Sequence, residues 1–405
     1  MVILDRIDED DRCKTMDKKI IAVAIVAVII IAAAGAFIIM NNDDDNVESG
    51  RDVAAIARVN TDGSGIYLKA GLNPADFYTQ DASGKITLVP AAWGGKVFGT
   101  PGTSTIQHVQ LQTLVEQMGL KFEKYVSGNK KTDTVYYSDS INNATAAIEK
   151  AGDLLDGGIL WEPQYSLIAS NEKYQEFLTT NELFPGHTCC LIAGSEKFMT
   201  ENPEATVAFL AAYVEAVKFI NVALADTNSD EYKQLVGICV KYTSGLTEDV
   251  IKDALSLVVY KFSDDNKTGS LDDLKKDLAS LESSLEDLGT IQKKITDLGF
   301  KNSTEFANAF VDDSYLSKAV SGDVKPLESK KKIIISAISG DIHQIGVRVA
   351  QDLGLFEKYN LDVTVNGVGN GPAVAKDLLG NQADFGFIGA PPLTSNVVNG
   401  DAIHA

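Results

Sequence analysis

The chain has 405 residues, of which 45% are hydrophobic, 33 are glycine and 10 are proline. This is the composition of a globular protein, and it excludes a chain that is disordered throughout. The formal net charge of -20 excludes a nucleic-acid partner, because no basic stripe is present to neutralise phosphates. A chain of this length has room for a pair of domains or for one large bilobed unit.

The first predicted element is an apolar segment at residues 20–40, "IIAVAIVAVIIIAAAGAFIIM". As a helix it is long enough to span a hydrocarbon core of about 30 Å. Lys18 and Lys19 precede it and acidic residues follow it, so residues 1–19 are expected in the cytoplasm and the rest outside the cell. We therefore predict a single-pass cell-membrane protein with an extracytoplasmic binding domain, a transmembrane anchor at 20–40 and a tether at 41–53. A cleaved signal peptide is the alternative.

Residues 54–194 alternate between predicted strands and helices. The segment "GKVFGTPGTSTIQHVQLQTLVEQMG" (95–119) predicts a strand, a Gly/Pro loop and a helix that is capped by Thr103 or Ser104 and ends at Gly119. Further strands are predicted at "AAIARVN", "KFEKYV", "TVYYS", "DGGILW" and "TCCLIAG". This β-α-β alternation indicates an α/β fold.

The middle of the chain is predicted to be helical. It contains the long apolar segment "NPEATVAFLAAYVEAVKFINVAL" and, from Leu271 to Leu288, leucines spaced three and four apart. The leucine stripe predicts a helix that packs on its own domain, and a partner-binding coiled coil is the alternative.

After residue 330 the α/β pattern returns. We predict a buried strand in "KKIIISAISG" (331–340), an amphipathic helix at 341–359, a strand in "LDVTVNGV", a helix in "GPAVAKDLLG" and a strand in "ADFGFIGA".

Four loops rich in Gly, Ser and Thr each follow a strand and precede a helix: "SGDIH" (339–343), "GNGPA" (369–373), "GAPPLTS" (389–395) and "GTPGTSTIQ" (99–107). Such loops lie together at the carboxyl ends of the strands in a doubly wound sheet, where ligands bind. No P-loop, Ser/His/Asp arrangement or paired carboxylates accompany them, so the residues do not indicate catalysis.

Metal-binding residues are few. "HTCC" (187–190) could donate ligands, but adjacent residues of a strand point to opposite faces, so no metal site is predicted there. At most one disulfide is conceivable, and it would involve Cys239. We expect no metal and no cofactor.

The segment "GLFEKYNLDVTVNGVGNGPAVAKDLLGNQADFGFIGAPPLT", together with "ARVNTDGSGI", "GKVFGTPGTSTIQHVQL", "DGGILWEPQYS" and "NPEATVAFLAAYVEA", resembles the solute-binding proteins of ABC transporters of the nitrate/sulfonate/taurine type. The resemblance implies a periplasmic-binding-protein type II fold, in which two lobes close on a small solute and pass it to the transporter permease. The solute would be sulfonate-, nitrate- or taurine-like, or nitrogen-containing. Thiamine-pyrimidine synthases, which share this fold and use a cysteine-rich motif, are the enzymatic alternative.

The order of the matching segments differs from that of the family. Residues 331–405 correspond to its first-lobe segment, and residues 54–330 to its second lobe, hinge strands and C-terminal helices. "GDAIHA" (400–405) is also similar to "GRDVAA" (50–55), which predicts a circular permutation. The alternatives are that 331–405 completes a neighbouring molecule's lobe, or that the gene is misjoined.

The resemblance also implies which residues line the ligand cleft. No Arg or Lys is among them, unlike a pocket built to clamp an oxyanion. The implied residues are Ser339, Gly340, Asp341 and His343 on one loop, Gly389, Pro391 and Pro392 on the next, Thr100, Gly102, Thr103 and Ser104 on the opposite lobe, and Trp161 and Glu162 across the mouth.

Overall fold

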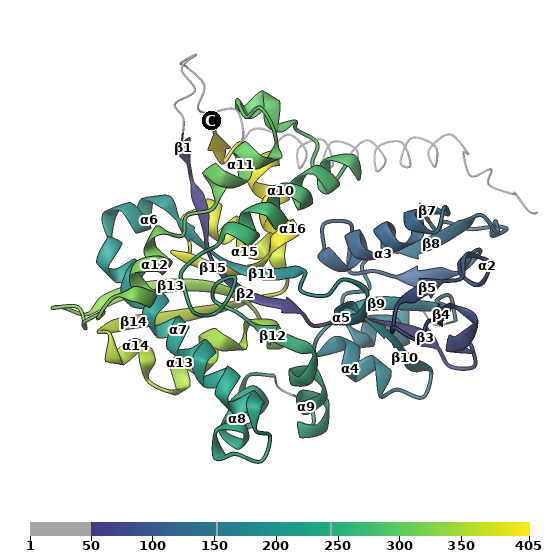
Figure 1. Cartoon of the computed structure of the whole chain (residues 1–405), viewed down its shortest axis with the longest axis horizontal. Coiled ribbons are helices and arrows are strands. Elements are labelled where there is room, and N and C mark those ends of the chain that lie inside the picture. Colours follow the sequence, from purple (N-terminus) through teal and green to yellow (C-terminus); the bar gives the residue numbers. More distant parts are fainter. Residues whose placement is uncertain (1–49, 151–152, 244) are drawn as a thin grey trace, which may run out of the picture. The chain divides into compact units, whose positions relative to one another are not determined.

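Two six-stranded mixed sheets form the framework of the described residues, which are 50–150, 153–243 and 245–405 of a computed structural model (Figure 1). Residues 50–62 and 188–405 build lobe A, and residues 64–187 build lobe B. The predicted anchor at 20–40 and most of the tether at 41–53 lie outside the described residues.

The sheet of lobe A combines strands from distant parts of the chain. Its order is β12-β2-β11-β15-β13-β14, in which β12, β2, β11 and β15 pair antiparallel and β15, β13 and β14 pair parallel. β2 and β11 are buried along their whole length, as expected for central strands with both faces covered. The strands are β1 (Gly50–Arg51), β2 (Val53–Asp62), β11 (Thr188–Ser195), β12 (Val258–Tyr260), β13 (Lys331–Ile338), β14 (Leu361–Val368), β15 (Phe385–Gly389) and β16 (Ile403–His404).

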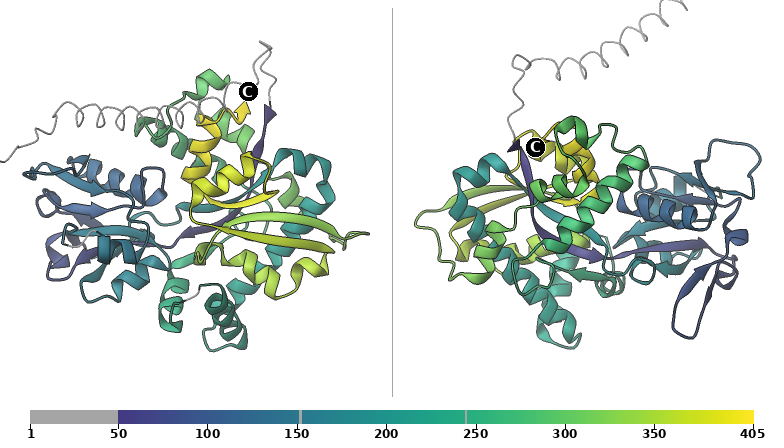
Figure 2. Two further views of the ribbon diagram at one scale, coloured as in Figure 1. Left: turned by 180° about the vertical axis from the view of Figure 1, so that it is seen from behind. Right: turned by 45° about the horizontal axis from the view of Figure 1, so that its top comes forward.

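Residues 331–405 complete this sheet within their own chain. Seen from behind, β13, β14 and β15 lie in the same lobe as the purple β2 (Figure 2). The pairing of β15 with β11 places Gly389 opposite Cys190. At the two ends of the described unit, β1 and β16 pair antiparallel, with Gly50 opposite His404.

Helices cover both faces of the lobe A sheet. Among the described residues, α7 is the one helix that is long and apolar enough to cross a membrane, and most of it is buried in the core, so a structural role accounts for it. The helices are α6 (Glu196–Glu201), α7 (Pro203–Ala225), α8 (Asp230–Tyr242), α9 (Glu248–Leu257), α10 (Asp272–Asp287), η3 (Ile295–Leu298), α11 (Ser303–Phe310), α12 (Ser314–Ser321), η4 (Ile342–Gln344), α13 (Ile345–Asp352), α14 (Leu355–Lys358), α15 (Gly371–Leu379) and α16 (Ala390–Asn399).

Lobe B is built on the sheet β10-β3-β9-β6-β8-β7, with one hydrophobic cluster on each face. Its strands are β3 (Ser64–Lys69), β4 (Tyr78–Gln80), β5 (Ile86–Leu88), β6 (Val97–Gly99), β7 (Lys121–Lys124), β8 (Thr134–Ser138), β9 (Gly157–Trp161) and β10 (Tyr174–Thr179). Its helices are η1 (Pro74–Asp76), α2 (Pro90–Trp93), α3 (Ile106–Gln117), the π-helical turn η2 (Ala146–Lys150), α4 (Gln164–Ala169) and α5 (Thr180–Leu183).

Two crossings, at residues 62–64 and 187–188, connect the lobes, and they are hydrogen-bonded to each other. The Asp62 N–H donates to the carbonyl of His187 (3.2 Å), and the Gly186 N–H donates to the Asp62 carboxylate (3.0 Å). Asp62 and Gly63 both have positive φ, of 63° and 86°. The pair of crossings has the form of a hinge.

Most predicted strands are present, and the leucine stripe packs on its own lobe, with Leu274, Leu278 and Leu285 buried on α10. The helix predicted over 341–359 is instead divided into η4, α13 and α14. The break before α14 comes at Gly354, whose φ of 67° leaves the helical region.

Two helix starts also differ from the prediction. α3 is capped by Thr105, whose hydroxyl accepts from the His108 N–H, and not by Thr103 or Ser104. α16 begins directly at Ala390, because prolines fit the first turn, where an N–H has no partner within the helix.

Candidate functional site

A pocket of about 150 Å³ lies between the two lobes. Loops at the ends of β6, β13, β14 and β15 reach it from both lobes, which is the arrangement that the four Gly-rich loops predicted. Its lining residues are Pro101, Gly102, Ser104, Thr105, Ile106, Gln107, Asn142 and Trp161 from lobe B, and Cys189, Cys190, Ile338, Asp341, His343, Asn370, Gly371, Pro372, Gly389, Pro391 and Pro392 from lobe A.

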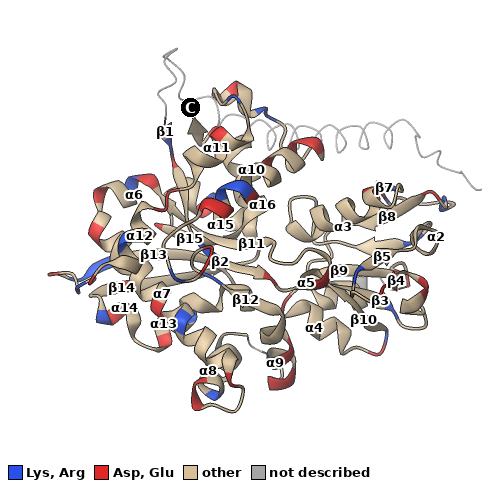
Figure 3. Ribbon diagram, in the orientation of Figure 1, with Lys and Arg blue, Asp and Glu red and all other residues tan. Residues whose placement is uncertain are grey.

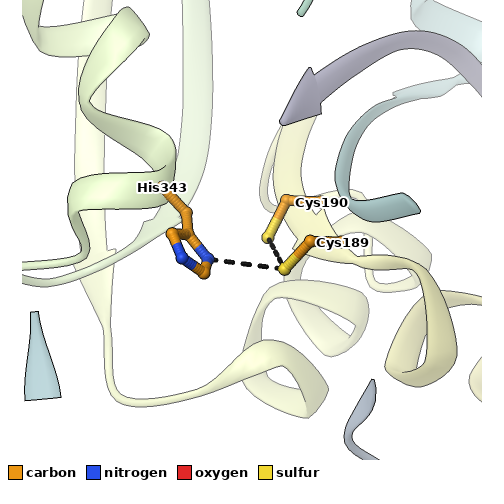
Figure 4. Close-up of side chains that lie close together, drawn as sticks. All are labelled: Cys189, Cys190 and His343. Carbon is orange, nitrogen blue, oxygen red and sulfur yellow. Dashed lines mark hydrogen bonds between the residues drawn. The ribbon is translucent and has the colours of Figure 1, made fainter. Parts of the chain in front are cut away.

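The prediction that Cys189 and Cys190 point to opposite faces is wrong. The register of β11 against β2 shifts both before and after Cys190, so the alternation of side chains is interrupted there. The two sulfur atoms consequently lie 3.8 Å apart on the cleft side (Figure 4). Neither forms a disulfide, and Cys239, on α8, is also a free thiol.

His343 approaches the two thiols from the end of β13. Asp341 caps the short helix η4 by accepting from the His343 N–H (2.9 Å). The ring Nδ1 is 3.4 Å from the Cys189 Sγ, and Nε2 is 2.7 Å from the carbonyl oxygen of Gly63. Cys189, Cys190 and His343 form the one group of this kind among the described residues whose donor atoms could share an ion.

Burial and mutual contact set the protonation of this cluster. The hydrogen bond from Cys190, together with the imidazole of His343, holds the pKa of Cys189 well below its usual value, whereas the pKa of Cys190 is raised by its bond to Cys189 and by burial. Burial opposes a charged His343, but the neighbouring Cys189 sulfur raises the pKa of the ring to about 9. Burial raises the pKa of Asp341 to about 6. The favoured state is a Cys189 thiolate beside a charged imidazole.

Most of the residues that the resemblance implied lie at the cleft. Those that line it are Gly102, Ser104, Trp161, Asp341, His343, Gly389, Pro391 and Pro392. They come from both lobes and from two distant parts of the chain, 102–161 and 341–392, so the structure brings together residues that are far apart in sequence.

Five implied residues do not line the cleft. Thr100 is buried, with its hydroxyl 3.0 Å from His108 Nδ1, and Thr103 is exposed at the rim, where its carbonyl accepts from Thr290 Oγ1 (3.3 Å). Ser339 and Gly340 lie on a separate hollow beside α8. Glu162 is fully buried and accepts from the backbone and hydroxyl of Ser166, because the chain turns inward after Trp161.

Several lining residues are not among those predicted from the sequence. Gln107 and the segment 370–372 belong to two of the four Gly-rich loops, so a signal for them was present. Cys189 and Cys190 were set aside because a regular strand separates neighbouring side chains, and a bulge is not visible in the residues. Asn142 gave no signal.

The fold and the cleft define a two-lobed α/β protein with a pocket between its lobes. The sequence profile of the NMT1-like family matches residues 21–237, more than half of the chain, and the chain belongs to this family. No curated protein sequence matches it significantly.

Solved structures of similar arrangement include transport proteins. One is the ligand-binding component of an ABC-type import system from Staphylococcus aureus with zinc bound (15% identity, 67% of this chain and 75% of that chain covered, TM-score 0.44). Another is the periplasmic nitrate-binding protein NrtA from Synechocystis PCC 6803 (13% identity, 66% of this chain and 67% of that chain covered, TM-score 0.47). A third is the periplasmic aliphatic sulphonate-binding protein SsuA from Escherichia coli (15% identity, 64% of this chain and 69% of that chain covered, TM-score 0.39).

Proposed function

We propose that this chain is the solute-capturing component of an ABC importer, which closes its two lobes on a small molecule and passes it to a permease. The observation that carries the proposal is the cleft between the lobes, lined by strand-end loops of both. A solute held there contacts both lobes at once, so its binding favours closure about the two crossings.

The sequence resemblance supports the same role, and two finer parts of the proposal follow from the sequence. The first rests on the apolar run at 20–40 and its flanking charges, and the second on the order of the segments that match the family. Residues 20–40 anchor the binding domain to the outer face of the cell membrane. The segment 331–405 is the family's first-lobe segment in permuted position.

The electrostatics of the cleft favour a neutral or cationic, nitrogen-containing solute over an anion. Among the described lining residues none is Lys or Arg, and Asp341 places a carboxyl group there. Figure 3 shows the Lys and Arg positions scattered over both lobes. Three helices start at the cleft, but Pro391 and Pro392 remove N–H donors from the first turn of α16, and caps occupy one donor each in α3 and α15. An anion therefore finds few partners.

A thermal-unfolding screen of the purified full chain in mild detergent tests the proposal. One arm contains betaines and aminopyrimidines, and the other nitrate, taurine and alkanesulfonates. A bound solute at a hundredfold excess over its Kd stabilises the protein by about 2.7 kcal/mol. We expect stabilisation in the first arm only. If no solute in either arm stabilises the chain, solute capture is contradicted.

A pair of variants tests the solute class. Asp341→Asn is expected to lower the affinity for a cationic solute by at least about tenfold, equivalent to about 1.4 kcal/mol of binding free energy. The exposed Asp323→Asn, outside the cleft, is the matched control and leaves the affinity unchanged. If an anion binds and its affinity is the same in the Asp341→Asn variant, the solute class is anionic and not cationic.

A pyrimidine-forming enzyme of the related branch is the second candidate, because Cys189 and His343 form a thiol–imidazole pair in the cleft. Turnover of an added solute, detected as a new product by mass spectrometry, would identify an enzyme. Recovery of the solute unchanged after unfolding the complex supports capture.

A further inference from the structure

The three side chains of the cluster Cys189, Cys190 and His343 already have the spacing of metal ligands. A tetrahedral ion with metal–sulfur bonds of about 2.3 Å and a metal–nitrogen bond of about 2.1 Å places two sulfurs about 3.8 Å apart and a sulfur and a nitrogen about 3.6 Å apart. The observed separations are 3.8 Å between the sulfurs and 3.4 Å between Cys189 Sγ and His343 Nδ1. All three donor atoms lie within 4.8 Å of one another.

The far side of the imidazole is arranged as in a metal-bound histidine. Its Nε2 lies 2.7 Å from the Gly63 carbonyl, which can only accept a hydrogen bond, so the proton resides on Nε2. A metal that binds here displaces the Nδ1 proton of the charged ring, and the lone pair that this leaves on Nδ1 is directed toward the thiols. The Cys190 N–H is fixed in turn by the Asn60 Oδ1 at 3.2 Å. Backbone and side-chain contacts therefore hold the donor atoms in place without an ion.

The identity and exposure of the donors define the class of ion. Two thiols and one imidazole favour soft or borderline transition metals over Mg²⁺ and Ca²⁺, which prefer oxygen. The exposed fractions of Cys189, Cys190 and His343 are 2%, 4% and 1%, so an ion would be shielded from bulk water. All three nevertheless line the cleft, which gives an entry path and leaves a fourth coordination position facing it.

From this geometry we propose that Cys189, Cys190 and His343 bind one thiophilic transition-metal ion, of the class of Zn²⁺ or Cu⁺, at the wall of the cleft, with its fourth coordination position open to the cleft. The inference goes beyond solute capture and does not depend on it. A chain that binds metal but none of the screened solutes would support the metal site and contradict solute capture. A chain that binds a solute but no metal would support solute capture and contradict the metal site.

Anaerobic titration of the purified full chain with Co²⁺ tests the proposal, with a phosphine reductant to keep the thiols reduced. We expect one Co²⁺ per chain, thiolate-to-cobalt charge-transfer absorption, visible bands of tetrahedral intensity, and loss of these bands when Zn²⁺ is added. A folded chain that shows no thiolate-to-cobalt absorption overturns the proposal.

Variants locate the ion. The chain has four cysteines, and the double variant Cys13→Ser, Cys239→Ser keeps only the two thiols of the cluster, so it must retain the absorption. Cys189→Ser, Cys190→Ser and His343→Gln are each expected to weaken Co²⁺ binding by more than the about 10- to 100-fold that loss of a supporting hydrogen bond costs. Circular dichroism checks that each variant is folded. If a cluster variant fails to fold, the double variant decides: retained absorption supports the site, and lost absorption contradicts it.

Discussion

At the scale of single residues, Glu162 shows how burial changes the role of a side chain. It was expected at the mouth of the cleft, but it is fully buried behind Trp161 and accepts from Ser166. Burial raises its pKa from 4.5 to about 7, although the hydrogen bonds from Ser166 act in the opposite direction. Its charge therefore changes within the physiological range of pH.

This shift makes stability depend on pH. Between pH 4.5 and about 7 the folded chain holds a proton on Glu162 that the unfolded chain has released, so stability falls as pH rises through this window. For Glu162→Gln, which does not titrate, we expect this part of the slope to disappear. The unfolding free energies of the two proteins should shift relative to each other by about 2–3 kcal/mol between about pH 5 and about pH 8, measured by urea denaturation.

The control for this measurement is the exposed Glu172→Gln in the same lobe. It should keep the pH dependence of the wild-type chain. Equal slopes for wild type and Glu162→Gln would mean that Glu162 does not titrate between the two pH values.

The residue scale also shows the limits of the sequence. The family resemblance predicted Asp341, Pro391 and Trp161 at the cleft, and Asp341 and Pro391 also belong to strand-end loops, which converge at one edge of a doubly wound sheet. Cys189 and Cys190 were not, because their convergence depends on a shift of register against β2, which depends on contacts between strands that are more than a hundred residues apart.

At the scale of elements, the connection between β2 and β3 is one of the two crossings of the hinge, and it also contacts His343 of the thiol–imidazole cluster. Gly63 has a φ of 86°, and a Cβ atom at this position would lie 2.5 Å from His343 Nε2 and 2.8 Å from Val258 Cγ2. Glycine is required there both by the backbone conformation and by the close approach of the ring.

We therefore expect Gly63→Ala to lower the unfolding free energy by more than the about 1 kcal/mol of backbone strain alone, and to weaken Co²⁺ binding by displacing His343. Gly71→Ala is the matched control, because Gly71 has a φ of 91° but nothing within 4 Å of the added atom. It should lose stability through strain and keep its metal affinity. The two effects are read from urea denaturation and Co²⁺ titration. Equal losses in both variants would exclude a specific contact with His343.

Helices and strands were largely predictable from periodicity, since most apolar runs correspond to the observed elements. The residues at which helices begin and end were less predictable. The caps of α3 and the start of α16 depend on which of several suitable residues forms the first turn, and neighbouring Thr, Ser and Pro residues leave that choice open.

At the scale of the molecule, both lobes use a mixed six-stranded sheet, but lobe A needs the last part of the chain to complete its own. Gly50 and His404 are paired in an antiparallel ladder, so a short turn could connect the two ends. The closeness of the ends is what a circular permutation requires, and the permutation itself stays a prediction.

A reordered chain tests whether the connectivity matters. In it, residues 331–405 precede residues 50–330, joined by a turn of about two to five residues between Ala405 and Gly50. Because the contacts are unchanged, we expect an unfolding free energy within about 2 kcal/mol of that of residues 50–405 in their present order, and the same Co²⁺ spectrum. A reordered chain that does not fold would mean that the present order is needed for lobe A to form.

The carbonyl of Gly63 accepts two hydrogen bonds, one from the His343 ring in lobe A and one from the Glu162 N–H in lobe B. One peptide group thus connects lobe B to the thiol–imidazole cluster. A change in the angle between the lobes would alter at least one of these two hydrogen bonds. By thermodynamic reciprocity, if closing the lobes changes the affinity of the cluster for its ion, the ion changes the closing equilibrium by the same factor. Occupancy of the cluster Cys189, Cys190 and His343 would then change how readily the two lobes close.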